Sequence, residues 1–378
     1  MVTQTTYVAC ISLAKMVMSN NRVLHVLDKL TPDSGVASVV MMLVSGIKEF
    51  TQDIAVYGDC DPLMKKEVIS HGGNVYVLPN ITQRLGVSYA KAFSALLQEN
   101  PPYGVVHGHL LNSAFIYLRE ALHKQVPVRI IHAHSAVGAD TFGKRMRNSM
   151  LSVGISRWAN TYVAVSEKAA QLAFNKSNKE IHIISNGINT SQFQYSEVIR
   201  KQIREELRLA DNVLCIGHVA RFSALKNHMF LLDVFKAMRV HTNCILVLVG
   251  DGPLVENVKS AVHTAGLSDY VKFLGARHDV NKLYQAFDVF LLPSLSEGFG
   301  LVAVEAQCAG LGCVVSEHVP TTVSCSDYIR FLPLDDVNVW AKTAFDMIQH
   351  NRADGADSVL SAELDAKTMC DKILEVYQ

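Results

Sequence analysis

Short apolar runs alternate with longer amphipathic stretches along most of the chain. The first run, Arg22–Leu27 (RVLHVL), has the aliphatic and β-branched composition of a buried strand. A helical pattern follows it at 36–50, and the same alternation continues to the end of the chain. Strands that alternate with helical patterns are typical of a parallel sheet with helical crossovers. The pattern therefore predicts an α/β protein.

The predicted strands fall into two series, which a charged helix beginning at Ser196 (SEVIRKQIREELRL) separates. We expect strands at 22–27, 53–57, 75–78, 104–107, 128–132, 162–165 and 181–184, and then at 213–219, 244–249, 271–274, 289–292 and 313–315. The expected domains are an extension over 1–21, Rossmann-like halves over 22–192 and 193–361, and a C-terminal helix over 362–378. Ligands bind at the carboxyl ends of such strands, so two facing halves predict a central cleft.

Composition narrows the function classes. The 378 residues suit two domains, and the balance of 35 Lys and Arg against 35 Asp and Glu does not favour nucleic acid. No apolar run is long enough for a transmembrane helix, and the N-terminal residues lack the features of a signal peptide. The 8 cysteines are scattered without a Cys-x-x-Cys pair, which favours a reduced, cytoplasmic protein.

One stretch, Pro293–Gly310 (PSLSEGFGLVAVEAQCAG), carries a candidate ligand site. Gly298 and Gly300 form a turn between a strand and a helix, where free backbone amides suit a phosphate. Glu297 and Glu305 flank this turn, and carboxylates so close to a phosphate must be aimed at hydroxyl groups on either side. The layout fits a diphosphate with a sugar at each end, which is a nucleotide sugar.

Two cations follow the first strand of the second series. Arg221 and Lys226 leave its carboxyl end together, where cations can meet a diphosphate, although two solvated surface charges would look the same. The turn at 250–253 (GDGP) follows the next strand and is explained by turn chemistry alone.

The same glycines admit a rival interpretation. The segment 298–303 also matches a Gly-x-Gly-x-x-Ala dinucleotide fingerprint, with Glu317 after the next strand. Five residues separate the preceding strand from Gly298, however, whereas a fingerprint turn follows its strand at once. This alternative also leaves Arg221 and Lys226 without a role, so we do not favour it.

Histidine pairs raise the question of a metal. The pairs 107/109 and 132/134 place alternate histidines on one face of a strand, and zinc accepts such ligands. No cysteine or acidic residue has a telling spacing to them, and Asp59-Cys-Asp61 looks like an ordinary solvated loop. We expect no metal and no cofactor.

A basic segment at 144–157 interleaves Lys144, Arg145, Arg147 and Arg157 with apolar residues. A basic amphipathic helix of this kind can rest on anionic lipid or meet a lipid-linked pyrophosphate. An ordinary helix with a solvated basic side is the alternative.

Taken in order, these motifs resemble glycosyltransferase family four, the retaining GT-B enzymes. The resemblance runs through residues 22–350 and is strongest for the subgroup that builds bacterial exopolysaccharide or capsule. It rests on Gly35 and on HAHS at 132–135, VSE at 165–167, NGI at 186–188, ARFSALKNH at 220–228, GDGP at 250–253, FLG at 273–275 and EGFGLVAVE at 297–305.

The resemblance implies a role for each matching residue. Glu297 would hold hydroxyls of the donor sugar and Glu305 those of the ribose. His134 would lie beside the reacting sugar, with His132 as the neighbour that could take its place. The first half would be the acceptor domain and the second half the nucleotide-sugar donor domain. The remaining binding residues would be Gly35, Arg221, Lys226, Phe299, Gly300 and Leu301 around the diphosphate and Arg277 near the base.

The implied function is a retaining transfer of a hexose-type sugar from a nucleotide diphosphate sugar, with UDP as the nucleotide. The acceptor would be a glycan or an undecaprenyl-linked glycan in bacterial exopolysaccharide, capsule or lipopolysaccharide biosynthesis. The enzyme would be cytoplasmic, at the inner face of the plasma membrane. Two rivals stay open: a sugar-nucleotide epimerase with the same fold, and a non-catalytic glycan-binding or scaffold protein.

Overall fold

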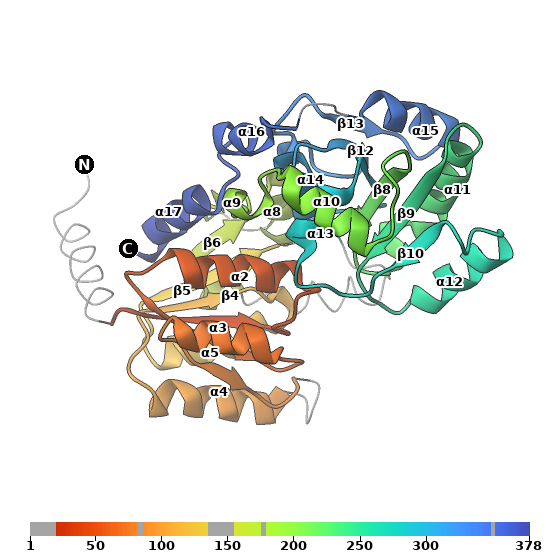
Figure 1. Ribbon diagram of the computed structural model, residues 1–378. Helices are drawn as coiled ribbons and strands as arrows, with labels where there is room; N and C mark the ends of the chain where they lie inside the picture. Colours follow the sequence, from red (N-terminus) through yellow and green to blue (C-terminus); the bar gives the residue numbers. More distant parts are fainter. Residues whose placement is uncertain (1–19, 82–85, 135–154, 175–178, 349–351) are drawn as a thin grey trace. The chain divides into compact units, whose positions relative to one another are not determined.

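A computed structural model describes residues 20–81, 86–134, 155–174, 179–348 and 352–378 (Figure 1). The chain divides into two compact units: unit 1 runs to Ser185 and includes Lys367–Gln378, and unit 2 is Asn186–Ala366. The expected boundary was at 192/193, whereas the two units meet at 185/186. The expected N-terminal extension falls almost entirely outside the described residues, as does nearly all of the basic segment at 144–157.

Unit 1 is built on a seven-stranded parallel sheet with the order β3-β2-β1-β4-β5-β6-β7. Its strands are β1 (Arg22–Leu27), β2 (Thr51–Val56), β3 (Val75–Val77), β4 (Val105–Gly108), β5 (Val128–Ala133), β6 (Thr161–Ala164) and β7 (His182–Ile183). Its helices are α2 (Gly35–Gly46), α3 (Pro62–Ser70), α4 (Val87–Glu99), α5 (Ala114–His123), α7 (Ile155–Trp158) and α8 (Glu167–Phe174), together with most of α17 (Ala366–Tyr377).

Unit 2 repeats the plan with a six-stranded parallel sheet of order β10-β9-β8-β11-β12-β13. Its strands are β8 (Leu214–Val219), β9 (Cys244–Val249), β10 (Val271–Phe273), β11 (Val289–Leu292), β12 (Gly312–Ser316) and β13 (Ile329–Leu332). Its helices are α9 (Thr190–Phe193), α10 (Glu197–Glu206), α11 (His228–Arg239), α12 (Val255–Thr264), α13 (Val280–Ala286), α14 (Leu301–Cys308), α15 (Val337–Asp346) and α16 (Gly355–Ser361).

The burial of the strands explains why their sequences are continuous apolar runs and do not alternate between apolar and polar residues. Every residue of β11 is fully buried, and so are Val23, Leu24, Val26 and Leu27 of β1. A parallel sheet that helices cover on both faces requires apolar side chains on both faces of its strands. The predicted parallel sheets are therefore confirmed, although β13 and α16 were not foreseen, and the expected terminal helix over 362–378 is α17, which begins at Ala366.

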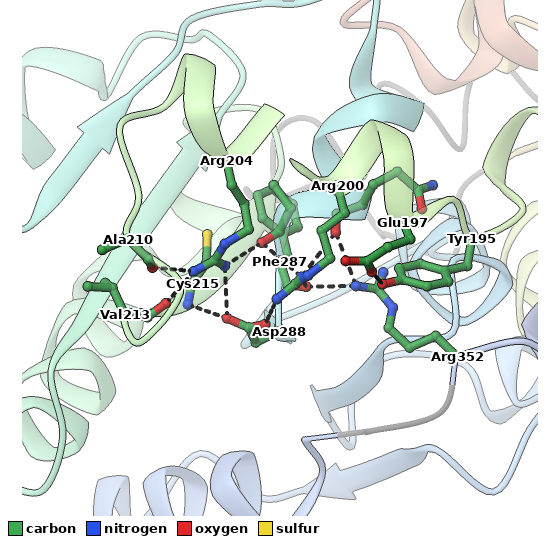
Figure 2. A network of polar contacts seen from close by, with 12 residues as sticks. Tyr195, Glu197, Arg200, Arg204, Ala210, Val213, Cys215, Phe287, Asp288 and Arg352 are labelled. Atoms are coloured by element: carbon green, nitrogen blue, oxygen red, sulfur yellow. Dashed lines mark hydrogen bonds and ion pairs between the residues drawn. The ribbon is translucent and has the colours of Figure 1, made fainter. Parts of the chain in front are cut away.

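Unit 2 is tied together by arginines around Asp288, the residue before β11 (Figure 2). Its carboxylate accepts hydrogen bonds from Arg200 (2.5 Å), Arg204 (3.3 Å) and the backbone N–H of Cys215 (2.7 Å). Arg352, which is 7% exposed, donates to the carbonyls of Tyr284, Gln285, Phe287 and Ala309. The network joins α10 to the first residues of β8 and β11, at the opposite end of the sheet from the candidate site.

None of the described helices is long and apolar enough to span a bilayer. The cysteines in the described part of the chain are all free, and most of them are buried.

Candidate functional site

The candidate donor residues lie where the strand order of unit 2 reverses. β8 and β11 are neighbours in the sheet, but the chain continues from β8 to β9 on one side and from β11 to β12 on the other. Loops diverge at such a point and leave room for a ligand at the carboxyl ends of the strands. Arg221 and Lys226 follow β8, and Glu297 follows β11, so the topology brings the predicted cations and carboxylate to one place.

Lys226 and Glu297 form an ion pair. The ammonium nitrogen of Lys226 lies 2.5 Å from Oε1 of Glu297, and the hydroxyl of Ser294 donates to the same oxygen at 2.6 Å. A backbone hydrogen bond from Leu295 to the carbonyl of Leu225 (2.7 Å) joins the two loops beside this pair. Glu297 is 8% exposed, so its charge is held by a defined set of partners in a largely dry place.

The glycine turn opens α14 as predicted. Gly300 is the N-cap residue and has φ of 100°, a conformation that residues with a Cβ rarely adopt. An added Cβ would also lie 3.2 Å from the side chain of Val319. Phe299 is buried beneath the turn, and Leu301 is the first residue of the helix, where the backbone N–H has no acceptor within the helix. These features suit an anion at the helix N-terminus.

Glu305 lies one turn inside α14 and meets a residue that the sequence did not single out. The hydroxyl of Tyr284 donates to its Oε2 at 2.8 Å. Burial raises the pKa of Glu305 to about 7, and this hydrogen bond acts in the opposite direction. The carboxylate is thus positioned by one strong donor and keeps acceptor sites for ligand hydroxyls.

The other two predicted cations of unit 2 differ in their surroundings. Arg221 is exposed, and the turn at 250–253 supports its segment, because an added Cβ on Gly250 would lie 2.1 Å from the carbonyl of Ala220. Arg277, between β10 and α13, instead donates to Asp279 at 2.7 and 2.8 Å and to Glu206 at 3.1 Å. These ion pairs fix Arg277 on the surface and raise its pKa.

In unit 1 the strand order reverses between β1 and β4. Gly35, the first residue of α2, follows β1; it is exposed and has open space where a Cβ would be. The hydroxyl of Ser34 caps this helix by accepting from the N–H of Ala37. The exposed N-terminus of α2 is consistent with the predicted place of Gly35 near an anion.

His134 belongs to a cluster of five histidines in unit 1. Its Nε2 lies 2.7 Å from Nδ1 of His109, and Nε2 of His109 lies 3.1 Å from Nδ1 of His25. The other two are His107 and His132, whose nearest nitrogens lie 3.1 Å apart. Burial lowers the pKa of His25 to about 4 and that of His134 to about 3, and the other three pKa values lie well below 6.5. The rings are therefore neutral at pH 7.

The histidine cluster contains ring nitrogens that lie close enough together to bind a metal ion. Two groups of three ring nitrogens, His25 with His107 and His109, and His109 with His132 and His134, lie within 4.8 Å of one another. The sequence revealed the two His-x-His pairs but not their junction with His25, because that residue lies on a separate strand.

Comparison with known proteins agrees with this geometry. The family model for glycosyl transferases group 1 matches residues 199–328, and the model for Glycosyltransferase Family 4 matches residues 34–192. Over 336 residues the chain is 32% identical to EpsF, a protein of Bacillus subtilis (strain 168) that is named as a glycosyltransferase. That match covers 86% of this chain and 87% of EpsF. The chain belongs to glycosyltransferase family four.

Other similarities agree with this assignment. A UDP-Gal:alpha-D-GlcNAc-diphosphoundecaprenol alpha-1,3-galactosyltransferase of Escherichia coli is 25% identical over 58% of this chain and 59% of its own length. Among solved structures, Anabaena HepE in complex with UDP and glucose has a TM-score of 0.77 at 20% identity, over 93% of this chain and 98% of HepE. WaaG, a glycosyltransferase involved in lipopolysaccharide biosynthesis, has a TM-score of 0.74 at 15% identity, over 94% and 99%. The predicted GT-B fold with two Rossmann-like domains is confirmed for this family-four glycosyltransferase.

Proposed function

We propose that this glycosyltransferase moves a hexose-type sugar from a UDP-sugar to a glycan or undecaprenyl-linked acceptor, with retention of configuration. Its pathway would be bacterial exopolysaccharide, capsule or lipopolysaccharide biosynthesis, at the inner face of the plasma membrane. Unit 2 would bind the donor and unit 1 the acceptor. No metal or other cofactor takes part in this proposal.

One observation carries the donor site: Lys226 and Glu297 are paired beside the Gly300 turn at the strand reversal of unit 2. Lys226, Arg221 and the amides near Leu301 would bind the diphosphate. Glu297 would accept hydrogen bonds from hydroxyls of the sugar. Glu305, held by Tyr284, would accept them from the ribose. Cations and amides placed around the diphosphate would stabilise the negative charge that develops as it departs.

A direct ligand contact is less well supported for Arg277 than for Arg221 and Lys226. Its guanidinium is engaged by Asp279 and Glu206, and a nucleotide base would have to share or displace these carboxylates. We propose that the Arg277 loop, held in shape by these ion pairs, lies beside the base.

The choice of UDP and of a lipid-linked acceptor is supported by similar proteins. HepE is described in complex with UDP and with UDP-glucose, and the E. coli relative uses UDP-Gal and a diphosphoundecaprenol acceptor. In the proposed reaction an acceptor oxygen bonds to the anomeric carbon as the bond from that carbon to the diphosphate breaks. The acceptor proton passes to the departing diphosphate, and His134 contacts the sugar.

A donor and acceptor panel tests the proposal. The purified protein would be incubated with UDP-glucose, UDP-galactose, UDP-N-acetylglucosamine and GDP-mannose, with and without diphosphoundecaprenol-linked sugars, and release of nucleoside diphosphate would be measured. We expect release from one UDP-sugar that depends on the acceptor, and an anomeric configuration in the product equal to that of the donor. Epimerisation without acceptor would instead identify an epimerase, and absence of nucleotide binding would indicate a scaffold protein.

A further inference from the structure

A row of four polar side chains crosses four neighbouring strands of unit 1. Gln52 lies on β2, His25 on β1, His109 directly after β4 and His134 directly after β5, and these strands are adjacent in the order β2-β1-β4-β5. The register pairs His25 with Ile54 and with His107, so the four residues share one face of the sheet. Successive polar atoms along the row are 2.8, 3.1 and 2.7 Å apart.

The first residue of the row has a fixed orientation. The amide nitrogen of Gln52 donates to the carbonyls of Leu43 (2.7 Å) and Ile47 (3.0 Å), at the C-terminal end of α2. An amide nitrogen has two protons, and both are used by these carbonyls. The amide oxygen of Gln52 must therefore face Nε2 of His25, where it lies 2.8 Å away.

This orientation determines where each proton of the row lies. An amide oxygen only accepts, so Nε2 of His25 carries a proton, and Nδ1 of this neutral ring is an acceptor. His109 must then donate from Nε2 to His25, which leaves its Nδ1 as an acceptor. His134 must in turn donate from Nε2 to His109. Its Nδ1 is buried and bare, and it has no hydrogen-bond partner among the residues that the structure describes.

We propose that Gln52 is a positioning residue that, through His25 and His109, holds His134 in the Nε2–H tautomer so that Nδ1 accepts a hydrogen bond from a substrate hydroxyl. The inference rests on the proposed function for the identity of that hydroxyl, which belongs to a sugar. The tautomer itself follows from the contacts within unit 1.

A second row in the cluster lacks such an anchor. The hydroxyl of Tyr377 lies 2.8 Å from Nδ1 of His107, whose Nε2 lies 3.1 Å from Nδ1 of His132. A hydroxyl can donate or accept, so this row can be protonated in either direction. His132, at 2% exposure, ends it with an Nε2 that has no partner in the described part of the chain. Of the two candidates for the reacting-sugar histidine, the anchored one is His134.

Nitrogen NMR of protein labelled with ¹⁵N-histidine tests the tautomer directly, because protonated and bare ring nitrogens resonate at separate positions. The His134 signals are assigned as those lost in His134→Gln. We expect Nδ1 of His134 to be bare in the wild type, and both of its nitrogens to be partly protonated in Gln52→Leu. Gln52→Leu also leaves the carbonyls of Leu43 and Ile47 without their hydrogen-bond donor. His109→Leu therefore serves as the second variant. His123→Asn, at an exposed histidine, is the control and should change nothing.

Kinetics supply an independent readout. Loss of one oriented hydrogen bond in the transition state should lower kcat about tenfold in Gln52→Leu and His109→Leu. The KM for the donor should change much less, because the residues proposed to bind the diphosphate, Arg221 and Lys226, belong to unit 2. His109→Gln offers an amide oxygen to Nε2–H of His134, so it should restore the tautomer and most of kcat.

Three results would overturn the inference: a protonated Nδ1 on His134 in the wild type, an unchanged tautomer in both leucine variants, or one equivalent of Zn²⁺ bound by the wild type and lost in His109→Leu. A metal would occupy the same nitrogens, so its binding excludes the proton order. If the tautomer changes as stated while no UDP-sugar is turned over, the proposed function fails and the proton order stands. If a UDP-sugar is turned over while the tautomer stays unchanged, the proton order fails and the proposed function stands.

Discussion

The ammonium nitrogen of Lys226 lies 2.5 Å from Oε1 of Glu297, although the two residues are 71 positions apart in the chain. Each was assigned to a different part of the donor, Lys226 to the diphosphate and Glu297 to the sugar. Without a donor the two charges compensate each other. A bound diphosphate must compete with Glu297 for the ammonium, so the two side chains should affect UDP binding in opposite directions.

Lys226→Ala should weaken UDP binding about tenfold to a hundredfold, since a hydrogen bond between charged groups contributes about 1.5–3 kcal/mol. Glu297→Gln should bind UDP at least as tightly as the wild type, because the competing charge is gone, and should still lose turnover of the UDP-sugar. Isothermal titration calorimetry with UDP and an assay of donor turnover measure the two effects. Lys236→Ala is the matched control, because Lys236 forms an exposed ion pair with Asp233 on the same helix. Weaker UDP binding in Glu297→Gln would refute the competition.

Glu305→Gln should change how stability depends on pH. The pKa of Glu305 is raised from 4.5 to about 7 in the folded protein. Between these values the folded state holds a proton that the unfolded state releases, so the free energy of unfolding falls as pH rises from 4.5 to 7. At about 1.4 kcal/mol per pKa unit, this loss is at most about 3.5 kcal/mol.

Urea unfolding at half-unit steps across this window measures the effect. The glutamine variant should lack this component, so its advantage over the wild type should grow with pH and become constant above 7. Glu256→Gln, at an exposed carboxylate, provides the baseline. Parallel curves for the wild type and Glu305→Gln would contradict the raised pKa.

Local sequence patterns predicted the fold because most strands are continuous apolar runs, whereas most helices show apolar residues at helical spacing. Arg22–Leu27 was expected as a strand and is β1 with the same bounds. Ile329–Leu332 was missed because β13 has only one buried residue, so its signal is weak. α16 (Gly355–Ser361) was missed because its seven residues are too few to show a helical period.

The site was predictable only where its residues share a loop or flank a strand end. Glycines and carboxylates in 293–310 indicated a phosphate site from sequence alone. Pairing of Lys226 with Glu297 depends on which strands are neighbours, and no local pattern records that. The same holds for Tyr284 with Glu305 and for Gln52 with His25, whose partners come from separate elements.

Asp288→Ala should strongly destabilise unit 2. Its carboxylate is the shared acceptor for Arg200, Arg204 and the N–H of Cys215. Arg204 has a side chain only 5% exposed, and removal of its partner would leave a buried charge uncompensated. The expected cost is about 3–5 kcal/mol of the free energy of unfolding.

Denaturant unfolding followed by the fluorescence of Trp340, which is buried in unit 2, checks this value. Asp233→Ala removes a carboxylate from an exposed pair and should cost less than about 1 kcal/mol. Equal effects of the two substitutions would show that the arginine network contributes little.

The histidine cluster should make unit 1 sensitive to acid. Burial lowers the pKa of His25 to about 4, below its ordinary 6.5, so between these values the unfolded state binds a proton that the folded state does not. The free energy of unfolding must then fall as pH drops from 6.5 to 4, by at most about 1.4 kcal/mol per pH unit from His25. His107, His109, His132 and His134 act in the same direction, whereas Glu305 opposes them with a single group.

His25→Asn should therefore show a shallower decline of the free energy of unfolding, measured in urea, between pH 6.5 and 4.5, although it is less stable at pH 7. The exposed His123→Asn should retain the steep decline of the wild type, and a shallow decline in the wild type itself would mean that the cluster is already protonated when folded.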